Sequence, residues 1–317
     1  MARKYHHLFG PVPSRRFGRS LGVDLTPPKT CTLDCVFCQL GRTPKKSLER
    51  REYVPTGDVI SELEDWLRTN GQADYITLSG SGEPTLHSHF GEILEFVRKN
   101  SKIPTLLLTN GTMLYLPEVR EAASHASIVK ASLSAWDDAS YGLVNRPHPS
   151  LRFDMLVEGE KAFRAGYDGK LYLEVFLVKG MNAAPEDVRK IAALAKQVAP
   201  DRIQLNTAVR PPAEEYSVPV TADEMESLCA LFDPRAEIIA DFRSTQGTHM
   251  RVTQDAMAAM LERRPCTAEQ IAQSFGMHMN EVSKYLGRLT RSGQVVTERR
   301  DGSIYYAAPS EKRRDPV

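Results

Sequence analysis

The stretch that decides the fold is Leu21-Gly-Val-Asp-Leu25-Thr-Pro-Pro-Lys-Thr-Cys31-Thr-Leu-Asp-Cys35-Val-Phe-Cys38, where an apolar strand pattern runs into a loop with three cysteines. Three thiolates on one short loop are able to converge on a cubane iron–sulfur cluster. A closed structural zinc site needs a fourth ligand, and the neighbouring sequence offers none. The alternatives are a zinc knuckle or three buried thiols. A cluster with three protein ligands leaves one iron open to bind a small molecule.

Working outward from this loop, short apolar runs alternate with amphipathic helical stretches from about residue 20 to 240, which is typical of βα units and a parallel sheet. The expected strands span residues 21–25, 75–79, 105–109, 128–133, 170–178 and 202–206. We therefore predict an α/β fold, a partial (β/α)6 TIM-type barrel. In such sheets ligands bind at the carboxyl ends of the strands.

A second architecture begins after a polar stretch around residues 243–251, which we interpret as a linker. Thr267 and Gln270 have the spacing of a capping box, and a helix over 280–292 would follow with helix-turn-helix spacing. Two short strands flanking an Asp-Gly turn at 301–302 predict a hairpin. The sequence thus predicts a catalytic domain over 1–248 and a small C-terminal winged-helix domain over 249–317.

The composition is that of an ordinary globular protein, with 41% apolar and 26% charged residues in 317. No apolar run approaches the roughly 18 residues that a membrane span needs, and the first ten residues lack the apolar core of a signal peptide. We therefore expect a cytoplasmic protein with no membrane partner. In that reducing compartment the five cysteines are not expected to form disulfides, and Cys229 and Cys266 are interpreted as small buried apolar residues.

Charge is unevenly distributed along the chain. Residues 1–53 carry a local net charge of +7 and residues 251–317 one of +3, while the total is only +1. Two interpretations remain open: a polyanionic partner such as a nucleic acid, or a solvated basic surface.

The cysteine spacing, directly after the first strand, resembles that of the radical S-adenosylmethionine (SAM) superfamily. The stretch from Phe9-Gly-Pro-Val-Pro-Ser-Arg-Arg16 through Cys38-Gln-Leu-Gly41 is similar to the branch of wyosine-type tRNA synthetases. This resemblance, over residues 8–240, implies that the three cysteines hold one [4Fe–4S] cluster and that SAM chelates the open iron. It also implies reductive cleavage of SAM to a 5′-deoxyadenosyl radical, with an electron donor such as flavodoxin or ferredoxin.

The resemblance also implies a set of SAM-binding residues. Phe37 matches the aromatic residue whose backbone contacts the adenine, and Ser79-Gly-Ser-Gly-Glu83-Pro84 resembles the glycine-rich GGEP motif that binds the SAM amino group. Glycines let backbone carbonyls approach an ammonium closely, and a carboxylate favours its charge. The implied cofactor-binding residues are Phe37, Gly80, Ser81, Gly82, Glu83, Asn110, Ser132, Ser134 and Asn145. For the last four, a role in turns or caps is the alternative.

Substrate recognition is expected at the same end of the sheet. The candidates are Lys179, Asn182, Asn206 and Arg210, which follow the fifth and sixth expected strands or end them. The chain lacks the second cysteine set of the tricycle-forming members, so wyosine chemistry itself is not expected. The catalytic residue that handles the substrate is unknown at this stage.

The function expected from these patterns is radical modification of a macromolecule, with RNA (tRNA) favoured and a peptide or protein second. The predicted recognition helix presents Lys284, Arg288 and Arg291 at helical spacing, which suits either nucleic acid or protein contact. The alternative from another class is an iron–sulfur redox sensor whose winged helix binds DNA. That alternative leaves Glu83 and Asn110 without a purpose.

Overall fold

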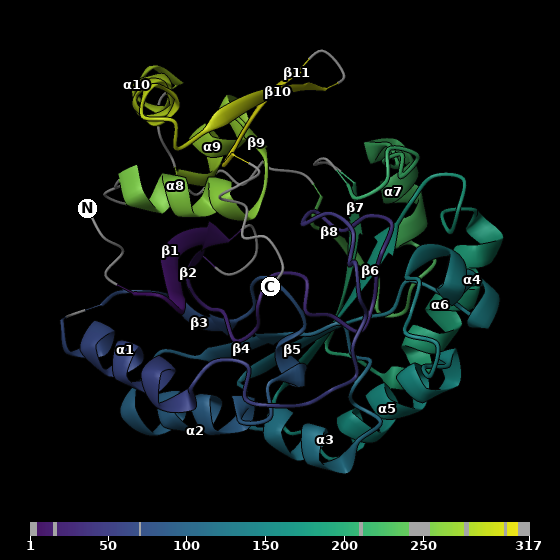
Figure 1. Cartoon of the computed structure of the whole chain (residues 1–317). Helices are drawn as coiled ribbons and strands as arrows, with labels where there is room; N and C mark the ends of the chain where they lie inside the picture. Colours follow the sequence, from purple (N-terminus) through teal and green to yellow (C-terminus); the bar gives the residue numbers. More distant parts are fainter. Residues whose placement is uncertain are drawn as a thin grey trace.

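One eight-stranded sheet organises the larger part of the chain (Figure 1). The computed structural model describes residues 5–14, 18–69, 71–208, 212–240, 254–275, 279–300 and 303–309. The strands lie side by side in chain order: β1 (Leu8–Ser14), β2 (Gly18–Val23), β3 (Tyr75–Leu78), β4 (Thr105–Leu108), β5 (Ile128–Ser132), β6 (Lys170–Leu177), β7 (Arg202–Thr207) and β8 (Glu237–Ile238). β1 pairs antiparallel with β2, and all later neighbours are parallel. The carboxyl ends of β2 to β7 therefore share one edge.

The six strands expected from the sequence are β2 to β7, which confirms the parallel, partial-barrel arrangement. Two further strands at the sheet edges were not expected. β1 contains Pro11 and Pro13, and proline, which has no N–H to donate, is tolerated on an edge strand. β8 has only two residues, too few to leave a recognisable pattern. β2 also ends at Val23, two residues earlier than expected, so Asp24 belongs to the loop that follows.

Helices cover the outer side of the curved sheet (Figure 1). They are α1 (Thr56–Arg68), α2 (Phe90–Asn100), α3 (Pro117–Ala123), α4 (Asp138–Val144), α5 (Phe153–Ala165), α6 (Pro185–Val198) and α7 (Ala222–Cys229), with a short 3-10 turn, η1, at Pro84–Leu86. The apolar face of each helix explains this packing. In α1, for example, Val59, Leu63 and Trp66 recur at helical spacing and are buried against the core. None of the helices in the described ranges is long and apolar enough to span a membrane.

The C-terminal part forms a second, smaller unit with its own hydrophobic core. Its elements are α8 (Gln254–Arg263), β9 (Cys266–Thr267), α9 (Ala268–Phe275), α10 (Met279–Arg291), β10 (Val296–Arg300) and β11 (Ser303–Ala307). The three strands form an antiparallel sheet in the order β10-β11-β9. The expected capping box is present, since Gln270 N–H donates to Thr267 Oγ1 at 3.2 Å and Thr267 N–H donates to Gln270 Oε1 at 3.1 Å.

This C-terminal unit lies over the β1 end of the large sheet, with α8 in contact with β1 (Figure 1). The helices and the two hairpin strands match those expected from the sequence, β9 was not expected, and the winged-helix assignment stays a prediction. The expected linker at 243–251, and with it the boundary at 248/249, lies outside the described residues, as does the hairpin turn at 301–302.

One buried carboxyl group in the larger core lacks the partners that such a group normally has. Glu160, on α5, is fully buried, and neither of its carboxyl oxygens has a hydrogen-bond partner within the described residues. Its Oε1 packs against Gly111, where an added Cβ would come within 2.7 Å. Burial raises the pKa of Glu160 well above its usual value, so the folded protein holds this carboxyl protonated.

We predict that Glu160→Met stabilises the protein at neutral pH. The folded-state pKa lies above the usual 4.5, so stability falls as pH rises above 4.5 because unfolding lets the carboxyl ionise. The substitution removes this loss and should add about 1–3 kcal/mol at pH 7.5, with a smaller gain at pH 5. Urea unfolding at the two pH values measures it. The control is Glu158→Met, an exposed position on the same helix. Equal gains at both pH values would contradict the prediction.

Candidate active site

The three cysteines of the loop each receive a side-chain N–H donor from a different residue. The pairs are Lys29 Nζ with Cys38 Sγ at 3.2 Å, Asn145 Nδ2 with Cys35 Sγ at 3.3 Å and Asn110 Nδ2 with Cys31 Sγ at 3.5 Å. The lysine comes from the loop itself, Asn110 from the end of β4 and Asn145 from the C-cap of α4. Such donors favour the thiolate form and tune a metal cluster bound to it.

Burial works against ionisation of these thiols. It raises the pKa of Cys31 to about 12, with the carboxylate of Glu83 as the next cause, and it raises the pKa of Cys35 further. Thiolates at this depth need a strong positive partner, which cluster irons supply. Within the described ranges no three His, Cys, Asp or Glu side chains gather closely enough to hold a single metal ion. Three cysteines on one loop suit a cubane, in which each binds a different iron.

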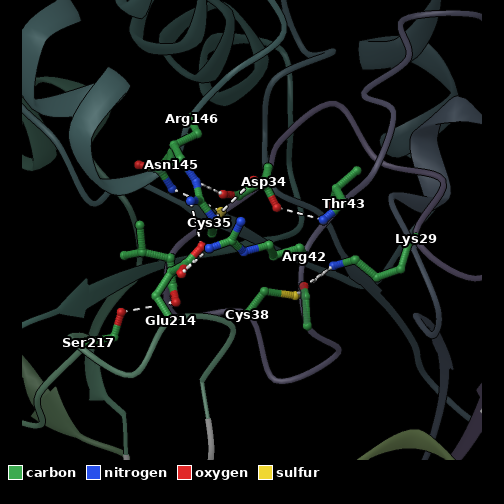
Figure 2. A network of polar contacts seen from close by, with 12 residues as sticks. Lys29, Asp34, Cys35, Cys38, Arg42, Thr43, Asn145, Arg146, Glu214 and Ser217 are labelled. Carbon is green, nitrogen blue, oxygen red and sulfur yellow. Dashed lines mark hydrogen bonds and ion pairs between the residues drawn. The ribbon is translucent and has the colours of Figure 1, made fainter. Parts of the chain in front are cut away.

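A network of charged side chains anchors the cluster loop (Figure 2). Arg146 donates from Nε to the Asp34 carbonyl at 2.6 Å and pairs with the Asp34 carboxylate at 3.0 Å. Its Nη1 donates to Glu214 at 2.6 Å, and Arg42 donates to the other oxygen of Glu214 at 2.7 Å. Asp34 in turn accepts from Thr43 N–H at 2.6 Å. The middle of the loop, at Asp34, and the segment that follows it, at Arg42, are thus tied to residues remote in the chain.

The glycine-rich loop after β3 packs directly on the cluster loop. A Cβ at Gly82 would lie 2.1 Å from the Thr30 carbonyl oxygen, so only glycine permits this approach. Gly80, with a φ of +148°, lies against the carboxylate of Asp24. Ser81 donates to that carboxylate from N at 3.0 Å and from Oγ at 2.6 Å. Asp24 therefore sets the shape of the loop expected to bind the SAM amino group.

Glu83 is buried, and four hydrogen bonds hold its carboxylate. Oε1 accepts from Thr85 N, Thr85 Oγ1 and Thr109 Oγ1 at 3.1, 2.6 and 2.6 Å, while Oε2 accepts from Asn110 N at 2.7 Å. Burial raises the pKa of Glu83 despite these donors. In this structure the carboxylate joins the glycine-rich loop to the loop that carries Asn110. Its expected contact with the SAM ammonium stays a prediction.

The remaining expected SAM contacts have different surroundings. Phe37 stacks on Phe176 with ring centroids 3.9 Å apart and planes 8° apart. Ser134 is buried, and its Oγ accepts from Phe176 N–H at 2.9 Å while its carbonyl accepts from Asn182. Ser132 ends β5 and is half-buried. Phe37 thus borders the site, whereas Ser134 and the substrate-side candidate Asn182 support the backbone around it.

A cavity of about 420 Å³ opens between the concave face of the sheet and the C-terminal unit. Cys38 and Gly80 border it on the cofactor side, and Phe37 forms part of its wall. Its depth is lined by residues of the strands, among them Lys130, Glu174 and Asn206. Ligand-binding cavities usually measure about 300–1,000 Å³, so this one has the size of a small-molecule site.

Of the four substrate-side candidates, the structure places Asn206 in this cavity. Lys179 lies outside it, in an ion pair with Glu224 at 2.7 Å, where both side chains are about half exposed. Arg210 falls outside the described residues. The sequence did not single out Lys130 and Glu174.

Residues of the C-terminal unit cover the cavity, and one of its arginines binds the aspartate that holds the glycine-rich loop. Arg263, at the end of α8, pairs with Asp24 at 3.1 Å and lies over the ring of Phe9, 3.2 Å from its centroid. Asp24 is the carboxylate that holds Ser81. The contact between Arg263 and Asp24 was not predicted from the sequence, because the two residues lie 239 positions apart and no local pattern connects them.

We predict that Glu214→Gln loosens the cluster loop. Hydrogen bonds from Arg42 and then Arg146 lower the pKa of Glu214 below its usual 4.5. The stabilisation is therefore present above pH 4.5 and is lost as pH falls through the folded-state pKa. The variant should melt a few degrees lower at pH 7 and like the wild type in strong acid, as followed by thermal unfolding. Glu215→Gln, at an exposed neighbouring position, is the control. A difference that persists in acid would contradict the ion-pair explanation.

Comparison with known proteins agrees with this geometry. The Radical SAM superfamily matches residues 25–195. A UPF0026 protein of Helicobacter pylori strain J99 is 35% identical over 307 residues, 95% of this chain and 97% of that protein. A protein of Brachyspira hyodysenteriae named GTPase Obg is 35% identical over 308 residues, 96% of this chain, which spans only 45% of that protein.

More distant similarities point to the same fold. The dual-specificity RNA methyltransferase RlmN of Caulobacter vibrioides is 26% identical over 200 residues, 59% of this chain and 48% of that protein. The crystal structure of a radical SAM methyltransferase from Sphaerobacter thermophilus superposes with a TM-score of 0.51 at 15% identity, covering 69% of this chain and 66% of that one. With three cysteines and their donors converging beside a glycine-rich loop, the chain belongs to the radical SAM superfamily, among the UPF0026 proteins, and is an enzyme that uses a [4Fe–4S] cluster and SAM.

Proposed function

We propose that the protein is a cytoplasmic RNA-modifying enzyme that generates a radical from SAM and directs it to one base of its substrate. A [4Fe–4S] cluster held by Cys31, Cys35 and Cys38 would, once reduced, supply the electron for reductive cleavage of SAM to methionine and a 5′-deoxyadenosyl radical. The electron would come from a carrier such as flavodoxin or ferredoxin. The chain's own residues hold the cofactors, exclude water and position the atom to be attacked.

The observation that carries this proposal is the covered cavity. It places Cys38 and Gly80, at the cofactor end, next to the polar residues Lys130 and Glu174 in one space of about 420 Å³. A folded partner does not fit such a space, so a macromolecular substrate has to insert a single group. Enzymes that act on a base of a nucleic acid solve this problem by flipping the base out of its stack into the pocket.

Charge and relatives favour RNA over a peptide. Arg263 and Arg264 of the C-terminal unit line the cavity, and Arg288 and Arg291 on α10 are exposed. Exposed cations attract a phosphate backbone, and binding releases its counterions. The side chain of Lys284, expected beside them, lies outside the described residues. The similarity to RlmN, named as an RNA methyltransferase, adds support from a distant relative.

The test is SAM cleavage by the anaerobically reconstituted enzyme, followed as 5′-deoxyadenosine. We expect about four irons per chain, because one cubane has ligands, and faster cleavage with cellular RNA than with peptide or metabolite pools. Faster cleavage with a peptide pool would replace RNA with protein modification. Cluster binding without any SAM cleavage would favour a redox sensor and contradict the proposal.

We predict that Lys29→Met makes the cluster harder to reduce. The ammonium donates to Cys38 Sγ at 3.2 Å, and loss of a donor and a positive charge disfavours the added electron. A hydrogen bond worth about 1 kcal/mol corresponds to a midpoint potential on the order of 40 mV more negative for a one-electron couple. Redox titration followed by electron paramagnetic resonance measures it.

The matched control is Lys45→Met, which removes one exposed lysine close in sequence to the same loop. It changes the net charge equally but has no described contact with a cysteine. Equal shifts in both variants would mean that overall charge, and not the bond to Cys38, sets the potential.

A further inference from the structure

We infer that Lys130, Glu174 and Asn206 form the recognition site for the reacting group, and that this site takes a planar, uncharged heterocycle bearing both hydrogen-bond donors and acceptors. The identification of that heterocycle as an RNA base rests on the proposed function. The site itself is argued from the contacts, burial and charge of these residues.

The three side chains come from three neighbouring strands and face the same cavity. Lys130 lies in β5, Glu174 in β6 and Asn206 in β7. Lys130 and Glu174 form an ion pair in which each side chain is only 10% exposed. Asn206 donates from Nδ2 to Glu174 Oε1 at 2.7 Å. Donor and acceptor groups are therefore held in fixed positions on three paired strands.

Such a buried ion pair is not what the stability of a sheet requires. Removing two charges from water is costly, and well-packed apolar side chains of similar volume are commonly as stabilising or more so. In TIM-type barrels, layers of bulky apolar side chains usually fill the interior. Here the interior instead keeps a cavity of about 420 Å³ beside the charged pair. The combination of lost packing and buried charge is explained by a ligand that uses both.

The chemistry of the wall defines the ligand. Lys130 offers donors, Glu174 offers acceptors and Asn206 offers both, while the pair is neutral in sum. A neutral group with mixed hydrogen-bonding edges suits this wall better than an ion does. Phe176 lies two residues after Glu174 on the same face of β6 and stacks on Phe37, so a flat aromatic surface borders the polar set. A planar heterocycle satisfies both features.

The experiment separates recognition from structural support by exchanging the two charges. K130E/E174K keeps an ion pair between the same strands but reverses donor and acceptor, and E174Q removes the charge alone. The probes are adenosine, guanosine, cytidine and uridine, each titrated calorimetrically into the reconstituted full-length enzyme. We expect at least one nucleoside to bind the wild type and to bind about ten- to a hundredfold more weakly in both variants. The affinity for SAM should change less than twofold.

Thermal unfolding of the exchanged variant shows whether the fold survives. Wild-type nucleoside affinity in K130E/E174K would make the pair structural and overturn the inference. A loss of SAM affinity equal to the loss of nucleoside affinity would assign the residues to the cofactor and also overturn the inference. The absence of nucleoside binding to the wild type would overturn it too. Nucleoside binding that depends on the pair, without stimulation of SAM cleavage by RNA, leaves the site standing and removes RNA as substrate. If RNA stimulates SAM cleavage equally in the wild type and in K130E/E174K, RNA remains the substrate and the proposed recognition site is wrong.

Discussion

Holding three thiolates in a poorly solvated loop is the constraint on which the rest of the site depends. Burial is the largest cause that raises the pKa of Cys31 and Cys35, and nearby negative groups add to it, so the loop needs cluster irons and N–H donors to make ionised sulfur acceptable. Each sulfur receives a side-chain donor, and the three side chains come from separate segments of the chain. The cluster site therefore exists only when the loops after β4 and after α4 have come to the cysteine loop.

The positions of these donors depend in turn on a further layer of contacts. Glu83 accepts from the Asn110 N–H, which sets the backbone from which the side chain reaches Cys31. Lys29 uses its backbone N–H to donate to the Ser81 carbonyl at 2.6 Å and its ammonium to reach Cys38. The glycine-rich loop and the cluster loop therefore position each other, which matches a chemistry in which SAM has to contact both.

Backbone strain gathers at the same place. Within the described residues three non-glycine residues have a positive φ, and two of them, Lys29 and Arg146, lie at the cluster loop. A left-handed conformation for such residues costs about 1–3 kcal/mol and persists where surrounding contacts hold it. Lys29 is held by Ser81, Gly41 and Cys38, and Arg146 by the carboxylates around it. The strain is thus a consequence of directing these two cations at the loop.

Sequence reasoning reached the parts of the structure that local chemistry determines. Strand and helix periodicities located β2 to β7, and the capping box at Thr267 marked a helix start that hydrogen bonds bear out. It missed contacts between distant positions, such as Arg146 with Glu214. It also missed Lys130, because β5 is buried almost throughout and shows no alternation that would assign a face. For the contact between Lys29 and the cysteine loop, the one local indication was that Lys29 lies two residues before Cys31.

The contact between Arg263 and Asp24 bears on how the two parts of the chain work together. Asp24 is 4% exposed, and it holds both Ser81 of the SAM loop and the arginine at the end of α8. Arg263 gives this buried carboxylate a cationic partner at 3.1 Å, so docking of the C-terminal unit helps to hold the residue that positions Ser81. The element that roofs the cavity is thereby connected to the glycine-rich loop. Substrate entry that displaces α8 would have to break this ion pair, which links access to the cavity with the order of the SAM loop.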